Sequence, residues 1–184
     1  SAHPDERRTF EIEGTTLSYP TTFRDGSSMM GLFAVPSAPM DQLIARSGLR
    51  SVEIAPGRTV LALNCVHYTD TDCGTYEEIV FSSFVRPPGP QPPIPYLGAL
   101  ASIARGTVAS FAWRLAVNSV LSQQAGLQMW GFPKSVADLS FRRDGGRATM
   151  TWEEDGQRVL AFSVPDNGSR RSKPIAPPVY GVLD

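Results

Sequence analysis

The sequence predicts an α+β fold that consists mostly of antiparallel β-sheet, closes into a barrel-like arrangement and has few helices. Three observations lead to this expectation. Several segments have the composition of half-buried strands, an Asp-Gly turn joins two of them, and only two stretches have apolar residues at helical spacing.

The clearest long strands are expected at residues 58–67 and 78–85, which are rich in β-branched and aromatic residues. A polar, glycine-containing turn at residues 69–74 separates them, so the two segments should form an antiparallel pair. Residues 29–35 have a similar composition and predict another strand.

The most specific local prediction is a β-hairpin near the C-terminal end. Residues 147–152 and 158–164 flank a turn that contains Asp155-Gly156, a dipeptide that favours tight hairpins. Phe141 begins a further strand candidate before the glycine-rich turn at residues 144–146.

Helical character is limited to two stretches. Residues 39–46 predict a short helix with proline at its start. Residues 99–120 carry apolar side chains at helical spacing and predict the main helix, although Gly106 weakens its centre. Residues 86–95 include six prolines and predict an extended connector.

Length and composition are typical of one globular domain. A chain of 184 residues with 41% hydrophobic and 19% charged residues can bury a sizeable core. We expect a single domain over residues 1–184, with residues 1–19 and 166–184 as extensions or edge segments. The formal net charge of −1 offers no basic field for a phosphate backbone, so we expect no nucleic-acid partner.

No apolar run is long enough to span a bilayer, and the first residues lack the apolar core of a signal peptide. We therefore expect a cytoplasmic protein without membrane contact.

Cys65 and Cys73 could form a disulfide or remain as two reduced thiols. We expect reduced thiols. With only His3 and His67 besides these cysteines, no metal site is expected.

The candidate for chemistry is Lys134, one of only two lysines in an arginine-rich chain. Unlike a guanidinium, an amine can lose its proton and attack a carbonyl. Lys134 follows Met129-Trp130-Gly131-Phe132-Pro133, in which proline stiffens the bend and the aromatic residues could wall a pocket. Desolvation by such walls would lower the pKa of the amine. The alternative is a surface lysine whose stem covers an apolar patch.

The segment Trp130-Gly131-Phe132-Pro133-Lys134, preceded by Gly126, resembles the active-site segment of the acetoacetate decarboxylase superfamily. Weaker similarities cover most of residues 20–165, among them residues 74–78. The resemblance implies the fold of that superfamily, a Schiff base on Lys134, no cofactor and a homo-oligomer of two or more subunits.

The resemblance also implies roles for individual residues. Glu78 would be the pocket carboxylate that accompanies catalytic Lys134. Arg24 is a loose candidate for the substrate-binding arginine, and a surface position is the alternative. The remaining candidates for substrate binding are Tyr76, Gln128, Met129, Trp130 and Phe132.

Three positions depart from the family pattern. Ser135 stands where the decarboxylase has a second lysine, Gln128 replaces a glutamate, and Ala62 falls where a second pocket glutamate is expected. Because the acidic and basic partners are missing, decarboxylation of acetoacetate itself is in doubt.

We therefore expect an enzyme that acts on a carbonyl compound, such as an oxo-acid or polyketide-like molecule, through decarboxylation, aldol-type chemistry or dehydration. Relatives in secondary metabolism carry out such reactions. The alternative is a pocket for non-covalent binding or cyclisation in which Lys134 forms no imine. A third possibility is a structural domain whose ancestral site has decayed.

Overall fold

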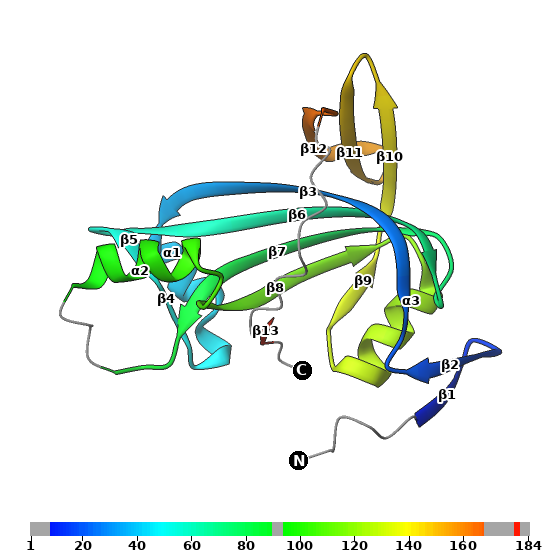
Figure 1. The fold of residues 1–184 in the computed structure, drawn as a ribbon, viewed down its shortest axis with the longest axis horizontal. Coiled ribbons are helices and arrows are strands. Elements are labelled where there is room, and N and C mark those ends of the chain that lie inside the picture. Colours follow the sequence, from blue (N-terminus) through cyan, green and yellow to red (C-terminus); the bar gives the residue numbers. More distant parts are fainter. Residues whose placement is uncertain (1–7, 90–93, 168–178, 181–184) are drawn as a thin grey trace.

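A computed structural model describes residues 8–89, 94–167 and 179–180. In these ranges the chain forms a large, strongly curved β-sheet and a smaller three-stranded sheet that projects from it (Figure 1). Short helices lie at the two ends of the large sheet (Figure 1). The described part is thus mostly β-structure with few helices, as the sequence predicts.

Two long strands form the centre of the large sheet. They are β6 (Arg58–Thr71) and β7 (Tyr76–Arg86), which pair antiparallel with Val66 opposite Glu78. The turn between them ends at Gly74, whose φ of +82° suits glycine. The predicted pair at residues 58–67 and 78–85 is therefore confirmed, and both strands are longer than expected.

The neighbours of this pair are also mainly antiparallel. β3 (Phe23–Pro36) pairs with β6, and β8 (Ala109–Val117) pairs with β7. The remaining strands of this sheet are β4 (Arg50–Ser51), β5 (Glu53–Ala55), β9 (Lys134–Val136) and β13 (Val179–Tyr180). β9 and β13 each pair parallel with β8.

The expected barrel does not form in the part of the chain that the structure describes. The strand order β13-β8-β7-β6-β3 has two ends, and β3 and β13 do not pair with each other. The chain leaves the large sheet after β9 and builds a separate sheet. An apolar pattern specifies which face of a strand is buried, and it does not specify whether the sheet closes.

The separate sheet contains β10 (Asp138–Asp144), β11 (Arg147–Glu154) and β12 (Gln157–Pro165). The turn at Asp155-Gly156 joins β11 to β12 and confirms the predicted hairpin, and β10 confirms the strand expected around Phe141. One face packs on the large sheet, where Met150 and Trp152 join Cys65 and Ile79 in a buried cluster.

The prediction of one long helix over residues 99–120 is wrong. Helix α2 (Pro95–Ala104) ends before Gly106, which has a φ of +66°, and β8 follows. β8 is buried on both faces, so its nearly continuous apolar run has no strand alternation to distinguish it from a helix. The other predicted helix is confirmed as α1 (Ser37–Leu43), followed by a short 3₁₀ turn (Ala45–Ser47).

A hairpin near the N-terminus lies beside helix α3 (Val120–Ala125) at one end of the molecule (Figure 1). It consists of β1 (Arg8–Ile12) and β2 (Thr15–Tyr19). Ile12 and Leu17 are each 1% exposed and pack with Tyr76 and Val117. These two residues, in the segment expected to be an extension or an edge segment, are therefore buried.

Cys65 and Cys73 are both buried and carry free thiols.

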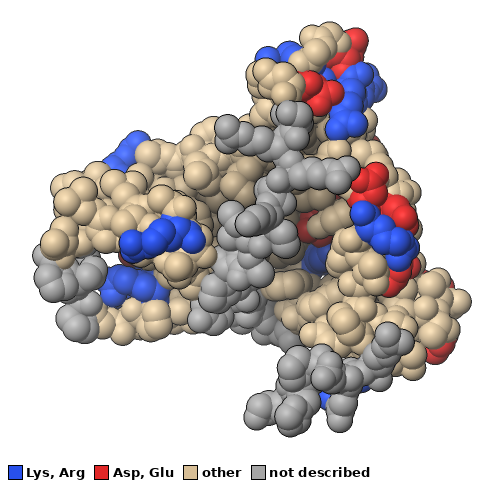
Figure 2. Space-filling view, viewed as in Figure 1, with Lys and Arg blue, Asp and Glu red and all other residues tan. Residues whose placement is uncertain are grey.

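Figure 2 shows basic and acidic side chains interspersed on the visible face of the projecting three-stranded sheet. No helix in the described ranges has the length and apolar character needed to cross a bilayer.

Candidate active site

A pocket of about 420 Å³ lies on the face of the large sheet opposite the projecting sheet. β7 contributes Tyr76, Glu78 and Val80 to it, because alternate residues of a strand point to the same face. Six aromatic side chains form much of its wall: Tyr19, Phe23, Tyr68, Tyr76, Trp130 and Phe132.

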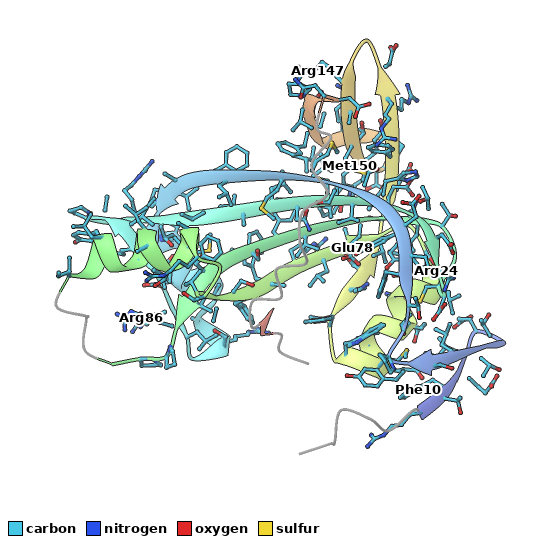
Figure 3. The ribbon with its side chains drawn as sticks, in the orientation of Figure 1. Phe10, Arg24, Glu78, Arg86, Arg147 and Met150 are labelled. Atoms are coloured by element: carbon cyan, nitrogen blue, oxygen red, sulfur yellow. The ribbon has the colours of Figure 1, made fainter. Side chains whose placement is uncertain are left out.

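Lys134 and Glu78 are the charged residues among those that line this pocket. Lys134 Nζ lies 2.6 Å from Glu78 Oε2, and the two side chains are 8% and 11% exposed. Nζ also donates to Ser122 Oγ at 3.3 Å and lies 5.7 Å from the centre of the Tyr76 ring. Figure 3 shows Glu78 on the central part of the curved sheet. The amine is thus held in an apolar wall next to a group that can accept its proton.

The backbone around the lysine explains its position. Helix α3 (Val120–Ala125) begins at Ser119, whose side chain accepts a hydrogen bond from the Ser122 amide. It continues into a π-helical turn, η2 (Gly126–Trp130), a feature often found at functional sites. Gly131, with a φ of +68°, ends that turn. After Pro133 the chain enters β9, which places Lys134 beside Leu115 of β8.

Gly126 is needed for the lysine to lie where it does. A Cβ atom on this residue would lie 2.7 Å from Cδ and 2.9 Å from Cε of Lys134, closer than such atoms approach in proteins. The glycine that precedes the lysine motif therefore makes room for the lysine stem.

Burial of the pocket disfavours negative charge on its tyrosines. Desolvation, followed by the charge of Glu78, raises the pKa of both Tyr68 and Tyr76 above the ordinary value. Both side chains therefore stay neutral at physiological pH. They can donate a hydrogen bond to a bound oxygen without becoming anionic.

Five of the predicted site residues converge on the pocket. They are Lys134, Glu78, Tyr76, Trp130 and Phe132. Their convergence supports a pocket location for Lys134 over the alternative of a lysine on open surface.

Three predicted residues lie outside the pocket lining. Gln128 is exposed on the π-helical turn, and Met129 packs against the cluster that contains Ile12. Arg24 lies away from Glu78 on β3 (Figure 3) and pairs with Asp70 at 2.7 Å and Asp72 at 2.6 Å. Its guanidinium is therefore engaged by two carboxylates at the surface.

His67 is part of a different cluster on the opposite face of the sheet. Its Nδ1 lies 2.9 Å from Glu77 Oε1, and its ring stacks on Phe141 with a centroid distance of 4.5 Å. Asn118 also hydrogen-bonds Glu77. Glu77 and Glu78 are adjacent in sequence and face opposite sides of the sheet. In the described ranges, no three side chains of the metal-binding types are grouped to hold an ion.

Several pocket residues were not predicted. Tyr68 lies directly opposite Tyr76 in the β6–β7 register, so the strand pairing could have identified it. Tyr19 and Phe23 enter the pocket from the N-terminal hairpin and β3, and Ser122 approaches the lysine from α3. No motif marks these three residues, because they meet the lysine only after folding.

Residues 14–179 match the family model described as acetoacetate decarboxylase. The fold is similar to the acetoacetate decarboxylase of Legionella pneumophila, with a TM-score of 0.56 and 14% identity over 79% of this chain and 49% of that one. A second acetoacetate decarboxylase structure gives a TM-score of 0.58 and 12% identity over 78% of this chain and 50% of that one.

A third similar structure is the enduracididine biosynthesis enzyme MppR, complexed with the condensation product of pyruvate and imidazole 4-carboxaldehyde. Its TM-score is 0.57, with 15% identity over 86% of this chain and 61% of that one. This chain thus spans about half to three-fifths of the length of these structures. A search of curated proteins gave no match.

Proposed function

Because the chain belongs to the acetoacetate decarboxylase family, we propose that it is an enzyme that acts on a small carbonyl compound through a Schiff base on Lys134. One observation carries the proposal. The only amine among the residues that line the pocket lies in a mostly apolar wall, 2.6 Å from a carboxylate that can take its proton.

The first step is proton transfer from Lys134 to Glu78. The neutral amine then attacks the carbonyl carbon of the substrate and forms a carbinolamine. Glu78 returns the proton to the carbinolamine oxygen, water leaves, and an iminium ion remains. The new positive charge forms next to the Glu78 carboxylate, which stabilises it.

The iminium ion accepts an electron pair from the substrate. In decarboxylation, the bond to a β-carboxylate breaks, CO₂ leaves, and the pair forms an enamine. In aldol cleavage, Glu78 takes the proton of a β-hydroxyl group, the Cα–Cβ bond breaks, and an aldehyde leaves. In dehydration, Glu78 takes an α-proton to give an enamine and returns it to the β-hydroxyl, which leaves as water while the electron pair forms a conjugated iminium ion. Protonation and hydrolysis then restore Lys134.

A second candidate is non-covalent binding or cyclisation in the same pocket. The short Lys134–Glu78 contact favours it, because each side chain already has its partner in the other and the amine is not free to attack a carbonyl. The aromatic walls would then bind an oxygenated, largely apolar molecule.

Reductive trapping separates the two candidates. The protein is incubated with acetoacetate and a panel of aldehydes, ketones and oxo-acids, reduced with cyanoborohydride, and digested for mass spectrometry. We expect a reduced adduct on the Lys134 peptide, and its loss in Lys134→Arg. The second lysine, Lys173, and the N-terminal amine serve as internal references for non-specific reaction.

Glu78 and the adjacent Glu77 provide a test variant and a matched control. Glu78→Gln should lower the trapping rate about 100-fold, because it removes the proton acceptor. Glu77→Gln changes the adjacent residue on the opposite face and should leave the trapping rate within about twofold of wild type. No adduct on Lys134 across the panel, with ligand binding unchanged in Lys134→Arg, would favour the non-covalent alternative.

A further inference from the structure

The pocket carries no spare positive charge for an anionic substrate. Of its lining residues, Lys134 and Glu78 are charged, and each neutralises the other at 2.6 Å. The other lining residues are apolar, aromatic or hydroxyl-bearing. A bound carboxylate would therefore lose hydration without gaining a cationic partner from the described lining.

The arginine expected to bind a carboxylate is engaged elsewhere. Both acidic partners of Arg24 lie within 2.7 Å of its guanidinium, at the surface and outside the pocket lining. Withdrawing it from them would leave Asp70 and Asp72 without their cation. Burial already opposes ionisation of Tyr68 and Tyr76, so the cavity disfavours a further unpaired negative charge.

The aromatic lining of the pocket favours an apolar substrate that contains a ring. Tyr68 lies 4.7 Å from Tyr76 and 5.2 Å from Phe23 between ring centroids, and Phe23 lies 6.5 Å from Trp130. Neighbouring rings are tilted by 34° to 45° to each other, and together they form an aromatic wall of the pocket that contains Lys134. The volume of about 420 Å³ suits a molecule with a ring better than a four-carbon acid.

We infer that the substrate is an uncharged aldehyde or ketone with an aromatic or conjugated group, and that the pocket selects against oxo-acids. The inference rests on the proposed Schiff base and narrows its chemistry to aldol cleavage or dehydration, because a substrate without a carboxylate cannot lose CO₂. The carbonyl carbon lies at Lys134 Nζ, and the ring packs among Tyr68, Phe23 and Trp130.

Two ketones with the same skeleton test the selection. Benzylacetone carries a methyl group where benzylpyruvate carries a carboxylate. Each is trapped with cyanoborohydride, and its rate on the Lys134 peptide is divided by its rate on N-α-acetyl-lysine, which removes the difference in intrinsic reactivity. We expect the normalised rate to favour benzylacetone by at least about tenfold, since an unpaired buried carboxylate is costly.

A charge added at the pocket edge provides the complementary test. Thr21 is a partly buried lining residue, so Thr21→Arg should bring a cation to the cavity and move the preference towards benzylpyruvate about tenfold. Thr21→Gln is the control of similar polarity without charge and should keep the wild-type preference.

The outcomes distinguish this inference from the proposed function. Faster normalised trapping of benzylpyruvate by the wild-type protein would overturn the inference and leave the Schiff base intact. Absence of any Lys134 adduct with either ketone and with the wider panel would overturn the Schiff base itself.

Discussion

The aliphatic stem of Lys134 lies directly against Gly126. A methyl group in place of the glycine hydrogen would therefore displace the lysine side chain. Gly126 has helical torsion angles, and alanine is favoured over glycine in helices by about 1 kcal/mol. A substitution here can therefore preserve the backbone while it moves the Lys134 amine.

Gly126→Ala should lower the rate of Lys134 trapping about tenfold to 100-fold, because a misplaced nucleophile reacts more slowly. The free energy of unfolding, measured by urea denaturation, should fall by no more than about 2 kcal/mol. Gly98→Ala is the matched control, since Gly98 lies in helix α2 and its added Cβ meets no atom within 4 Å. Equal trapping rates in the two variants would contradict the packing role of Gly126.

Helix α3 is short, and its start depends on a single cap. Ser119 accepts a hydrogen bond from the amide of Ser122, the residue that contacts the lysine amine. The cap therefore stabilises the start of the helix and also fixes the position of Ser122, whose hydroxyl contacts Lys134 Nζ.

Ser119→Ala should lower the free energy of unfolding by about 1 kcal/mol, the usual effect of losing a cap. Ser119→Asp keeps an acceptor at the same position and should retain most of that stability. Urea denaturation of both variants gives the comparison. If alanine and aspartate are equally destabilising, the side-chain acceptor at Ser119 is not what stabilises the start of α3.

Strand β6 brings ionisable groups into the core. Burial raises the pKa of the Cys65 thiol to about 12, and it also raises the pKa of Tyr68. Both groups are neutral when protonated, so the unfolded chain loses these protons at lower pH than the folded chain. Their contribution to stability is complete below the unfolded pKa and is lost as pH rises through the folded pKa.

The free energy of unfolding should therefore decrease above about pH 9, where an unfolded thiol ionises, with a slope of about 1.4 kcal/mol per pH unit for Cys65. Urea denaturation from about pH 8 to pH 11 measures it. Cys65→Val removes this thiol and should reduce the slope over that range. An unchanged slope in the variant would show that the Cys65 thiol does not contribute to the alkaline loss of stability.

At the scale of the whole molecule, the open sheet leaves β3 as an end strand with exposed apolar side chains. Met30 is 60% exposed and Leu32 is 53% exposed, and both lie on the same face as Val80. Exposed apolar side chains on an end strand are typical of contact surfaces. They support the expectation that the protein forms a homo-oligomer.

We expect sedimentation velocity to show a dimer or larger assembly. The double variant Met30→Lys/Leu32→Lys should shift the protein towards the monomer, because it places charges on that surface. Val159→Lys changes an exposed apolar residue on β12 and should have little effect. A wild-type protein that remains monomeric over the accessible concentration range would contradict the expectation.

The local parts of the fold and the bend that carries Lys134 were predictable from the sequence. The Asp155-Gly156 hairpin, the β6–β7 pair and the lysine bend each depend on residues close together in the chain. Burial of β8 on both faces removed its alternation, so the prediction of a helix there was wrong. For Arg24 the sequence left both a substrate-binding role and a surface position open, and in the fold it pairs with Asp70 and Asp72 at the surface.

By itself the sequence determined that Lys134 stands in a stiff aromatic bend, because proline, glycine and bulky side chains act on their immediate neighbours. Only the tertiary structure decided which groups surround its amine. Glu78, Ser122 and Tyr68 come from three different elements and reach Nζ or the adjacent wall through strand register and helix packing. Register and packing are non-local, since they depend on which faces of distant segments are buried together.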